Sequence, residues 1–383
     1  MRLLFLSLCI AFLLPKAVSA QQLDLSGFEI SVDQDRFTDF LRDTILEDKN
    51  HVIGLRVGFY GSYANSYYLG LPWVRETVDA LWLDELIYNR GVDVETISHN
   101  FTFTVNGFSP RLISDETDFF DAALAGGYDL AQDRPFSSFT GFRSTRRLEG
   151  SKLFAHSAYR LDMAITTSFT FGFMSLGLAQ GVENLFGGNR PSAVLWDRDE
   201  NETYPTGQAF RAGLPVFLYS FSYEAVVLRP LRKIVIQARP EFNLGYYTDV
   251  GFGIDVGKVM NVEKNVDNLG YTDTNNPSVL KVNNENISFA FSIGGTLRAV
   301  LYNAHLNALF NDRTHHIAFA DTRKIVLEGY IGAKVQILKK IEFSMSINQR
   351  TSQFSLEQRD ARFWGTLGLK YLLAPEGEGC YDL

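Results

Sequence analysis

Side chains arranged for chemistry are sparse in this sequence. It has no Gly-x-Ser-x-Gly turn to present a nucleophilic serine, and no His-Glu-x-x-His motif or paired cysteines to hold zinc. His315 and His316 are adjacent, and we interpret them as loop residues, with a metal-binding pair as the alternative. The glycines between Gly245 and Gly253 lie in alternating strand sequence, so we expect close contacts on the side that faces the lumen of a barrel and not a phosphate cradle.

The elements that must position any site are strands with a two-residue period. Over 161–173 the odd positions are mostly apolar or aromatic and the even positions are small or polar, and 341–349 repeats this pattern. Several such runs are longer than the roughly five or six residues of a typical soluble strand. Tilted strands of about 9–11 residues cross a bilayer. The pattern therefore predicts an all-β fold, a transmembrane antiparallel β-barrel.

The chain is predicted to hold about twelve strands and one short helix. Turns such as 338–340 are expected to be periplasmic, and long connections such as 261–286 extracellular. The segment 72–88 has helical spacing and predicts a helix within an early connection, with its apolar face packed against protein or lipid headgroups. The expected strands lie near 27–34, 52–62, 94–105, 135–147, 151–175, 207–226, 232–242, 248–259, 286–302, 323–337, 339–352 and 361–373.

The N-terminus predicts export. Arg2, the apolar stretch 3–14 and Val18-Ser19-Ala20 before Gln21 are typical of a cleaved signal peptide, and an N-terminal membrane anchor is the alternative. Cleavage would remove Cys9 and leave one cysteine, Cys380, which excludes an intramolecular disulfide scaffold. We expect a signal peptide over 1–20, one barrel over 21–373 and a polar tail over 374–383. The formal net charge of −8 argues against a nucleic-acid partner.

Five segments, in chain order, match the motifs of one family. They are 30–35, 50–56, 133–139, 180–197 and 348–354, and the Asp-Arg-Pro-Phe block at 133–136 is the most specific. The chain in this respect resembles the outer-membrane lipid A 3′-O-deacylases of the LpxR type over essentially its whole mature length. The resemblance implies a twelve-stranded barrel in the bacterial outer membrane. It also implies hydrolysis of the 3′-acyloxyacyl ester of lipid A, the membrane anchor of lipopolysaccharide.

The resemblance also implies a site. Gln34 and Asp35 fall on the family's first-strand Asn-Asp, where oxygen ligands hold Ca²⁺, although Asp35 has an alternative interpretation as a solvated lumen carboxylate. Gln180 falls on the glutamine that precedes the catalytic histidine, and that histidine falls on Asn184. The family's second-strand threonine falls on Val52.

Three of these matches change the chemistry. Asn184 cannot accept a proton near neutral pH, Val52 has no hydroxyl, and a family lysine falls near Asp115. His51 adjoins Val52, but the two-residue period turns it to the opposite face. The alternatives to a deacylase are therefore a non-catalytic barrel that binds lipid or docks a partner and, less favoured, a small solute channel. Expected partners are lipid A and the barrel-insertion machinery.

Overall fold

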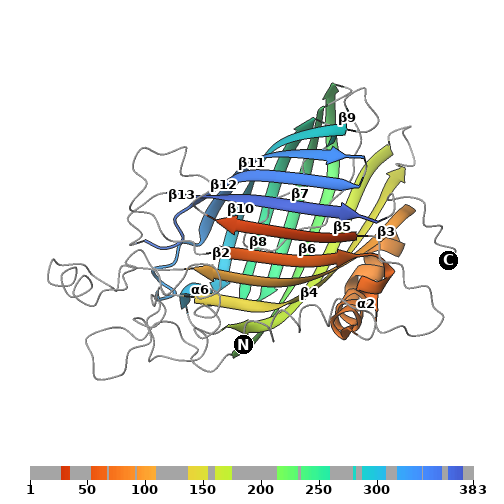
Figure 1. Cartoon of the computed structure of the whole chain (residues 1–383). Coiled ribbons are helices and arrows are strands. Elements are labelled where there is room, and N and C mark those ends of the chain that lie inside the picture. Colours follow the sequence, from red (N-terminus) through yellow and green to blue (C-terminus); the bar gives the residue numbers. More distant parts are fainter. Residues whose placement is uncertain are drawn as a thin grey trace, which may run out of the picture.

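The computed structural model shows one β-barrel whose two ends are easily told apart (Figure 1). We call the end where β1 begins at Gly27 and β13 finishes at Leu372 the terminal end, and the other the distal end. The structure describes residues 27–34, 53–66, 69–90, 93–108, 137–153, 160–174, 214–231, 234–258, 279–281, 287–307, 317–338, 340–355 and 361–373.

The sheet closes on itself. Thirteen strands pair antiparallel in sequence order; β10 pairs both β8 and β11, while the three-residue β9 pairs β10 alone, so twelve strands form the ring. Closure removes the free edges that a long sheet would otherwise expose. The strands are β1 (Gly27–Gln34), β2 (Ile53–Tyr60), β3 (Asp93–Phe108), β4 (Ser137–Leu153), β5 (Arg160–Met174), β6 (Leu214–Leu231), β7 (Ile234–Gly245), β8 (Tyr247–Lys258), β9 (Val279–Lys281), β10 (Ile287–Asn303), β11 (Ile325–Ile337), β12 (Ile341–Thr351) and β13 (Ala361–Leu372).

The outer face of the barrel is apolar and the inner face polar. Alternate residues of β8, such as Val250, Phe252 and Ile254, are half exposed on the outside, whereas Asp249 and Asp255 are buried on the inside. The same alternation runs through the other strands, so Phe, Leu and Ile side chains form an outward belt. The belt includes Ile30, Phe142, Phe171, Phe217, Leu244, Phe291, Ile293, Leu297, Leu327, Ile331, Phe343, Met345, Leu367 and Leu369.

The barrel and its twelve-strand ring confirm the prediction, but two details were wrong. The fourth strand was expected to end near 147; β4 continues to Leu153 and β5 begins only at Arg160. The connection after Lys258 was expected on the side opposite the turn 338–340. The residues that flank it, Lys258 and Ile287, instead lie at the terminal end, the same end as that turn, because Ile287 is opposite Ile337. Loop length alone does not tell the two ends apart.

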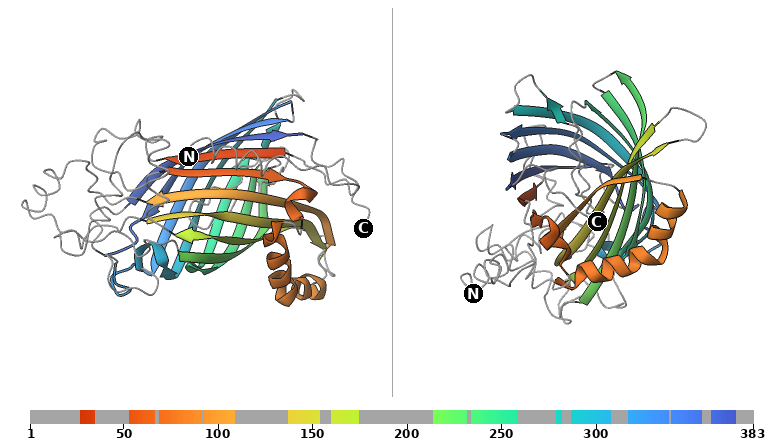
Figure 2. Two further views of the ribbon diagram at one scale, coloured as in Figure 1. Left: turned by 60° about the horizontal axis from the view of Figure 1, so that its bottom comes forward. Right: turned by 90° about the vertical axis from the view of Figure 1, so that its right-hand side faces the viewer.

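The expected helix is present as α2 (Leu71–Arg90), preceded by a 3₁₀ turn, η3 (Ser62–Asn65). It follows β2 at the terminal end and lies outside the ring of strands (Figure 2). A second, one-turn helix, α6 (Ala304–Asn307), follows β10 at the distal end. Within the described part of the chain, no helix is long and apolar enough to cross a membrane.

Candidate functional site at the distal end and in the lumen

The residues expected in the site come from connections that leave the same end of the barrel. β1 ends at Gln34 and β2 begins at Ile53, and their register joins Asp33 to Gly54 at the distal end. β5 also ends there, at Met174, opposite Leu214. Of the residues named for the site, Asp35, Val52, Gln180 and Asn184 lie outside the described residues, as do His51, Asp115, His315 and His316. Gln34 is described only as the last residue of β1, opposite Gly365.

Beside the expected Ca²⁺ ligands, the described residues do not fit a cation. The buried Asp33 carboxylate accepts a hydrogen bond from the Arg56 guanidinium at 2.8 Å. A divalent ion at Asp33 would lie next to this positive charge, which is unfavourable. Asn106 approaches from β3: a Cβ added at Gly54 would lie 2.9 Å from Asp33 Oδ2 and 3.1 Å from Asn106 Oδ1. Gly54 therefore leaves the room in which these two side chains meet.

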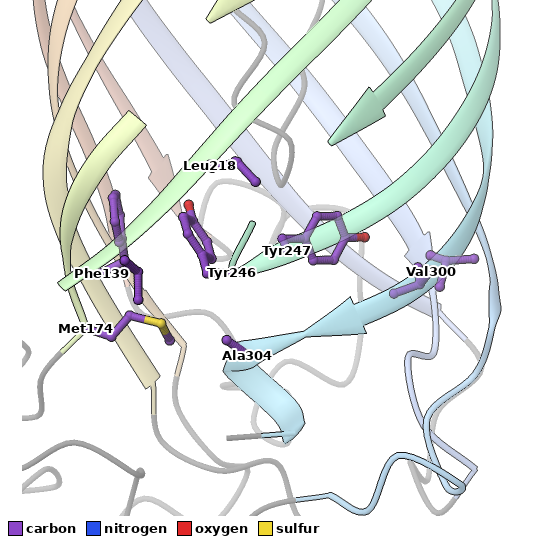
Figure 3. Packing of buried hydrophobic residues seen from close by; sticks show 9 residues of the cluster. Phe139, Met174, Leu218, Tyr246, Tyr247, Val300 and Ala304 are labelled. Carbon is purple, nitrogen blue, oxygen red and sulfur yellow. The ribbon is translucent and has the colours of Figure 1, made fainter. Parts of the chain in front are cut away.

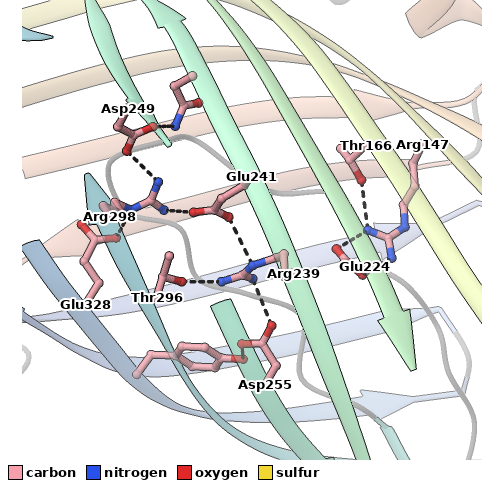
Figure 4. A network of polar contacts seen from close by, with 12 residues as sticks. Arg147, Thr166, Glu224, Arg239, Glu241, Asp249, Asp255, Thr296, Arg298 and Glu328 are labelled. Carbon is pink, nitrogen blue, oxygen red and sulfur yellow. Dashed lines mark hydrogen bonds and ion pairs between the residues drawn. The ribbon is translucent and has the colours of Figure 1, made fainter. Parts of the chain in front are cut away.

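The lumen between β7 and β11 is filled by a network of ion pairs centred on Arg298 (Figure 4). Its guanidinium donates to Asp249 at 2.9 Å and to Glu328 at 2.7 Å, and it also contacts Glu241. Asn243 donates to the other oxygen of Asp249 at 2.7 Å. Arg298 is 1% exposed, so its charge is balanced by these carboxylates and not by bulk water.

A second group of ion pairs continues this network along the inner wall. Arg239 contacts Glu241 at 3.2 Å and Asp255 at 3.4 Å, and it donates to the Thr296 hydroxyl at 3.0 Å. The Tyr330 hydroxyl donates to Asp255 at 2.9 Å. The glycines expected to face the lumen do so: Cβ atoms added at Gly251 and Gly253 would contact the side chains of Glu241 and Arg239. Small residues on β8 thus make room for large charged neighbours.

Charged side chains also pair on another part of the inner wall, between β4 and β6. Arg147 on β4 donates to both carboxylate oxygens of Glu224 on β6, at 3.0 and 2.7 Å, and to Glu149 at 2.9 Å. Arg147 is 1% exposed. Paired, bidentate charges of this kind hold side chains in fixed positions across a barrel. The lumen is therefore a packed polar interior.

Toward the distal end, the inner wall carries an apolar layer (Figure 3). Its residues come from β4, β5, β6, β8, β10 and β11 and from the start of α6, and all are buried. Tyr246, the single residue between β7 and β8, stacks on Phe139 with ring centroids 5.1 Å apart. The layer consists of Phe139, Met174, Val216, Leu218, Tyr246, Tyr247, Val300, Ala304 and Val326.

A serine and a histidine meet at the edge of this layer. The Ser137 hydroxyl and His305 Nδ1 form a short hydrogen bond, and the His305 ring lies edge-on to Tyr246. Both side chains are buried, at 0% and 2% exposure. A serine next to a histidine is an arrangement that hydrolases use, but a nucleophile must also be open to its substrate. The burial of this pair favours a structural role in fixing α6 to β4.

Sequence reasoning missed this contact and the partners in the lumen. Ser137 directly follows the Asp-Arg-Pro-Phe block, which was the one available signal that it matters. His305 lies in α6, which directly follows β10, so the strand pattern does not include it. The charged residues at inward positions were visible in the alternation. Their pairing depends on the relative register of strands such as β4 and β6, which do not pair with each other and are joined only through β5.

Comparisons with known proteins agree with this fold. No family model matches the chain, and no curated protein sequence matches it. Among solved structures it is similar to LpxR from Salmonella typhimurium, with 14% identity, a TM-score of 0.57, and coverage of 90% of this chain and 99% of that one. An outer-membrane channel from Pseudomonas putida F1 matches at 7% identity and a TM-score of 0.39, covering 94% and 98% of the two chains. Outer membrane phospholipase A from Escherichia coli matches at 8% identity and a TM-score of 0.30, covering 91% and 97%.

Only the first of these likenesses is strong enough to compare folds. The resemblance expected from the sequence is confirmed at that level, since nearly the whole of LpxR superposes on this barrel. Identity of 14% says nothing about which reaction, if any, the two proteins share. The chain is an outer-membrane type β-barrel with the fold of LpxR.

Proposed function

We propose that this protein is a barrel of the bacterial outer membrane that acts on lipid A in the outer leaflet, as a 3′-O-deacylase. The observation that carries the proposal is the LpxR fold over nearly its full length, together with the motif resemblance at 30–35, 133–139 and 180–197. The connections that hold the expected residues leave one end of the barrel. A site at that end would meet the headgroup and first ester bonds of a membrane lipid.

Ester hydrolysis needs a base to activate water and positive charge near the developing oxyanion. In the family, bound Ca²⁺ supplies the positive charge. Here Gln34 and Asp35 would hold this ion, as the sequence resemblance implies. Asp33 is not proposed as a ligand because its carboxylate pairs with Arg56. Gln180 would orient the reacting group. Asn184 leaves the base unassigned, and His51 is the histidine adjacent to Val52 in sequence.

A second candidate function is favoured by one observation, the asparagine at position 184. An amide cannot take up the proton that hydrolysis releases. In this alternative the barrel binds lipid A, or docks a partner at its loops, without cleaving the ester. Both candidates use the same end of the barrel and differ only in turnover.

The experiment is mass spectrometry of lipid A from outer membranes that produce the chain with Ca²⁺ present. A deacylase removes the 3′-acyloxyacyl group from the wild-type sample. The variant His51→Ala then tests whether this histidine is the base. Activity that is lost in Asp35→Asn but kept in Lys340→Gln, an exposed residue at the terminal end of the barrel, tests the metal ligand.

The second candidate predicts a different result from the same assay. Wild-type lipid A is then unchanged, and Asn184→His combined with Val52→Thr restores deacylation. Val52→Thr alone is the matched control, since it supplies the hydroxyl without the base. Unchanged lipid A in the wild type and in the double variant would exclude the hypothesis that this barrel supports deacylation, even with the family's histidine and threonine restored.

A further inference from the structure

Helix α2 packs on the outer wall of the barrel. On β4 the lumen-facing Arg147 alternates with Ser144 and Arg146, which face outward. Arg75 of the helix donates to the Ser144 hydroxyl at 3.1 Å, and Arg146 lies 3.6 Å from the Asp79 carboxylate. Figure 2 shows the helix outside the strands when the barrel is viewed along its axis.

Two described charged side chains of the helix, Arg75 and Asp79, face the wall. Asp79 accepts hydrogen bonds from the hydroxyls of Thr167 on β5 and Tyr219 on β6, each at 2.8 Å. Asp79 also lies 3.8 Å from Arg75, one turn earlier. Arg75 and Asp79 are both fully buried.

The opposite face of the helix, which we call the outward face, carries no charge among its described residues. It consists of Trp73, Thr77, Ala80 and Leu81. Trp73 is 59% exposed and Leu81 is 77% exposed. The Thr77 hydroxyl donates to the carbonyl of Trp73 at 2.9 Å, so its polar group is satisfied within the helix.

This polarity is the reverse of that of a helix in water. A helix on a soluble protein buries its apolar stripe and exposes its charges. Exposed apolar side chains together with buried, fully paired charges are instead expected where hydrocarbon surrounds the helix, because an unpaired charge there is costly. Hydroxyl bonding to the preceding turn also satisfies Thr within lipid.

The outward face also continues the apolar belt of the barrel. Trp82 of the helix packs against Phe221 and Phe242, at ring-centroid distances of 5.0 and 5.8 Å. Farther along the same strands, Phe217 and Leu244 are exposed belt residues. The surface that runs from these strands over α2 is therefore apolar without a break of charge in the described residues.

We propose that α2 lies in the membrane against the barrel, with its outward face covered by the acyl chains of the bilayer. The helix then acts as a cover: it satisfies Ser144, Arg146, Thr167 and Tyr219, polar groups that the outer wall would otherwise present to lipid. The inference rests on membrane insertion of the barrel, which is part of the proposed function, and not on deacylation.

The test is the accessibility of a nitroxide spin label attached at Leu81→Cys, in proteoliposomes of the purified chain without native cysteines (Cys9→Ser and Cys380→Ser). Molecular oxygen concentrates among acyl chains, whereas a nickel chelate stays in water. Ile331→Cys on the belt and Lys340→Cys in a turn of the terminal end serve as lipid and water references. Trp73→Cys repeats the measurement on the same face of the helix, about two turns earlier.

Lipid burial of α2 gives a ratio of oxygen to nickel accessibility at Leu81 that matches Ile331 and exceeds Lys340. The proposal is overturned if this ratio at Leu81 matches that at Lys340 while the label at Ile331 remains highly accessible to oxygen. That outcome includes the case in which a water-soluble partner protein covers the helix in the cell. A nickel-accessible Ile331 contradicts insertion itself and, with it, both proposals.

Discussion

Single buried arginines link nearby strands along the inner wall of the barrel. Arg298 is surrounded by Glu241, Asp249 and Glu328, so its removal takes away the cation that these three carboxylates share. Removing one partner of a buried charge pair typically costs about 3–5 kcal/mol. The same residues also fill the volume through which a solute would have to pass.

We expect Arg298→Met to lower the free energy of unfolding by about 3–5 kcal/mol, because three carboxylates lose their common partner. Urea-dependent tryptophan fluorescence in detergent measures the change. Arg323→Met makes the same substitution at an exposed residue and is expected to change stability by less than about 0.5 kcal/mol. Equal effects of the two substitutions would contradict a stabilising role for the network.

At the scale of elements, α2 is held to the wall by charge pairing together with apolar packing of Trp82 and Leu83. Its contacts with β4, β5 and β6 pass through Arg75 and Asp79, and Leu83 adds apolar packing at the end of the described side chains. The helix is thus fixed by a few specific contacts. Its attachment should be much more sensitive to loss of a carboxylate than to changes on its outward face.

We expect Asp79→Ala to release α2 from the wall, because Arg75 and Arg146 lose their buried counter-charge. A cost of about 3 kcal/mol corresponds to a roughly hundredfold larger open population. The rate of tryptic cleavage after the buried Arg75, in detergent, measures this opening. Thr77→Ala on the outward face is the control. Cleavage of both variants at the same rate would show that the ion pairs do not hold the helix.

The elements also mark the limit of what the sequence predicts. The two-residue period identified every strand of the ring, and helical spacing identified α2. The predicted boundary between β4 and β5 was wrong because Arg146, Arg147 and Glu149 suggest a polar turn. In the structure β4 continues through them, with Arg147 facing inward and Arg146 facing outward. Partners such as Arg147 and Glu224 could not be predicted, since they depend on register across an intervening strand.

At the scale of the whole molecule, side chains occupy the lumen in two ways. Ion pairs fill its middle, and the layer around Phe139, Tyr246 and Tyr247 lines it toward the distal end. A ring of twelve strands is narrower than the roughly 16–18-stranded porins that leave an aqueous channel, and here charged side chains are buried in its interior. Function at the rim or on the outer wall fits this architecture better than transport through the lumen.

We therefore expect no steady ion conductance when the purified barrel is inserted in planar lipid bilayers, because its lumen is filled by paired charges and aromatic rings. Heat-modified migration on gels confirms that the inserted sample is folded. A stable single-channel current from the wild-type protein would favour the solute channel and contradict a closed lumen.

The most direct measurement of the central claim is release of fatty acid from lipid A by the purified, folded barrel with Ca²⁺ present. We expect the 3′-acyloxyacyl chains of lipid A in the product of the wild-type barrel, and the matching loss of mass in the remaining lipid A. Absence of released fatty acid from the wild type would contradict deacylation by this protein, and its absence also from the variant carrying Asn184→His and Val52→Thr would contradict a deacylase scaffold.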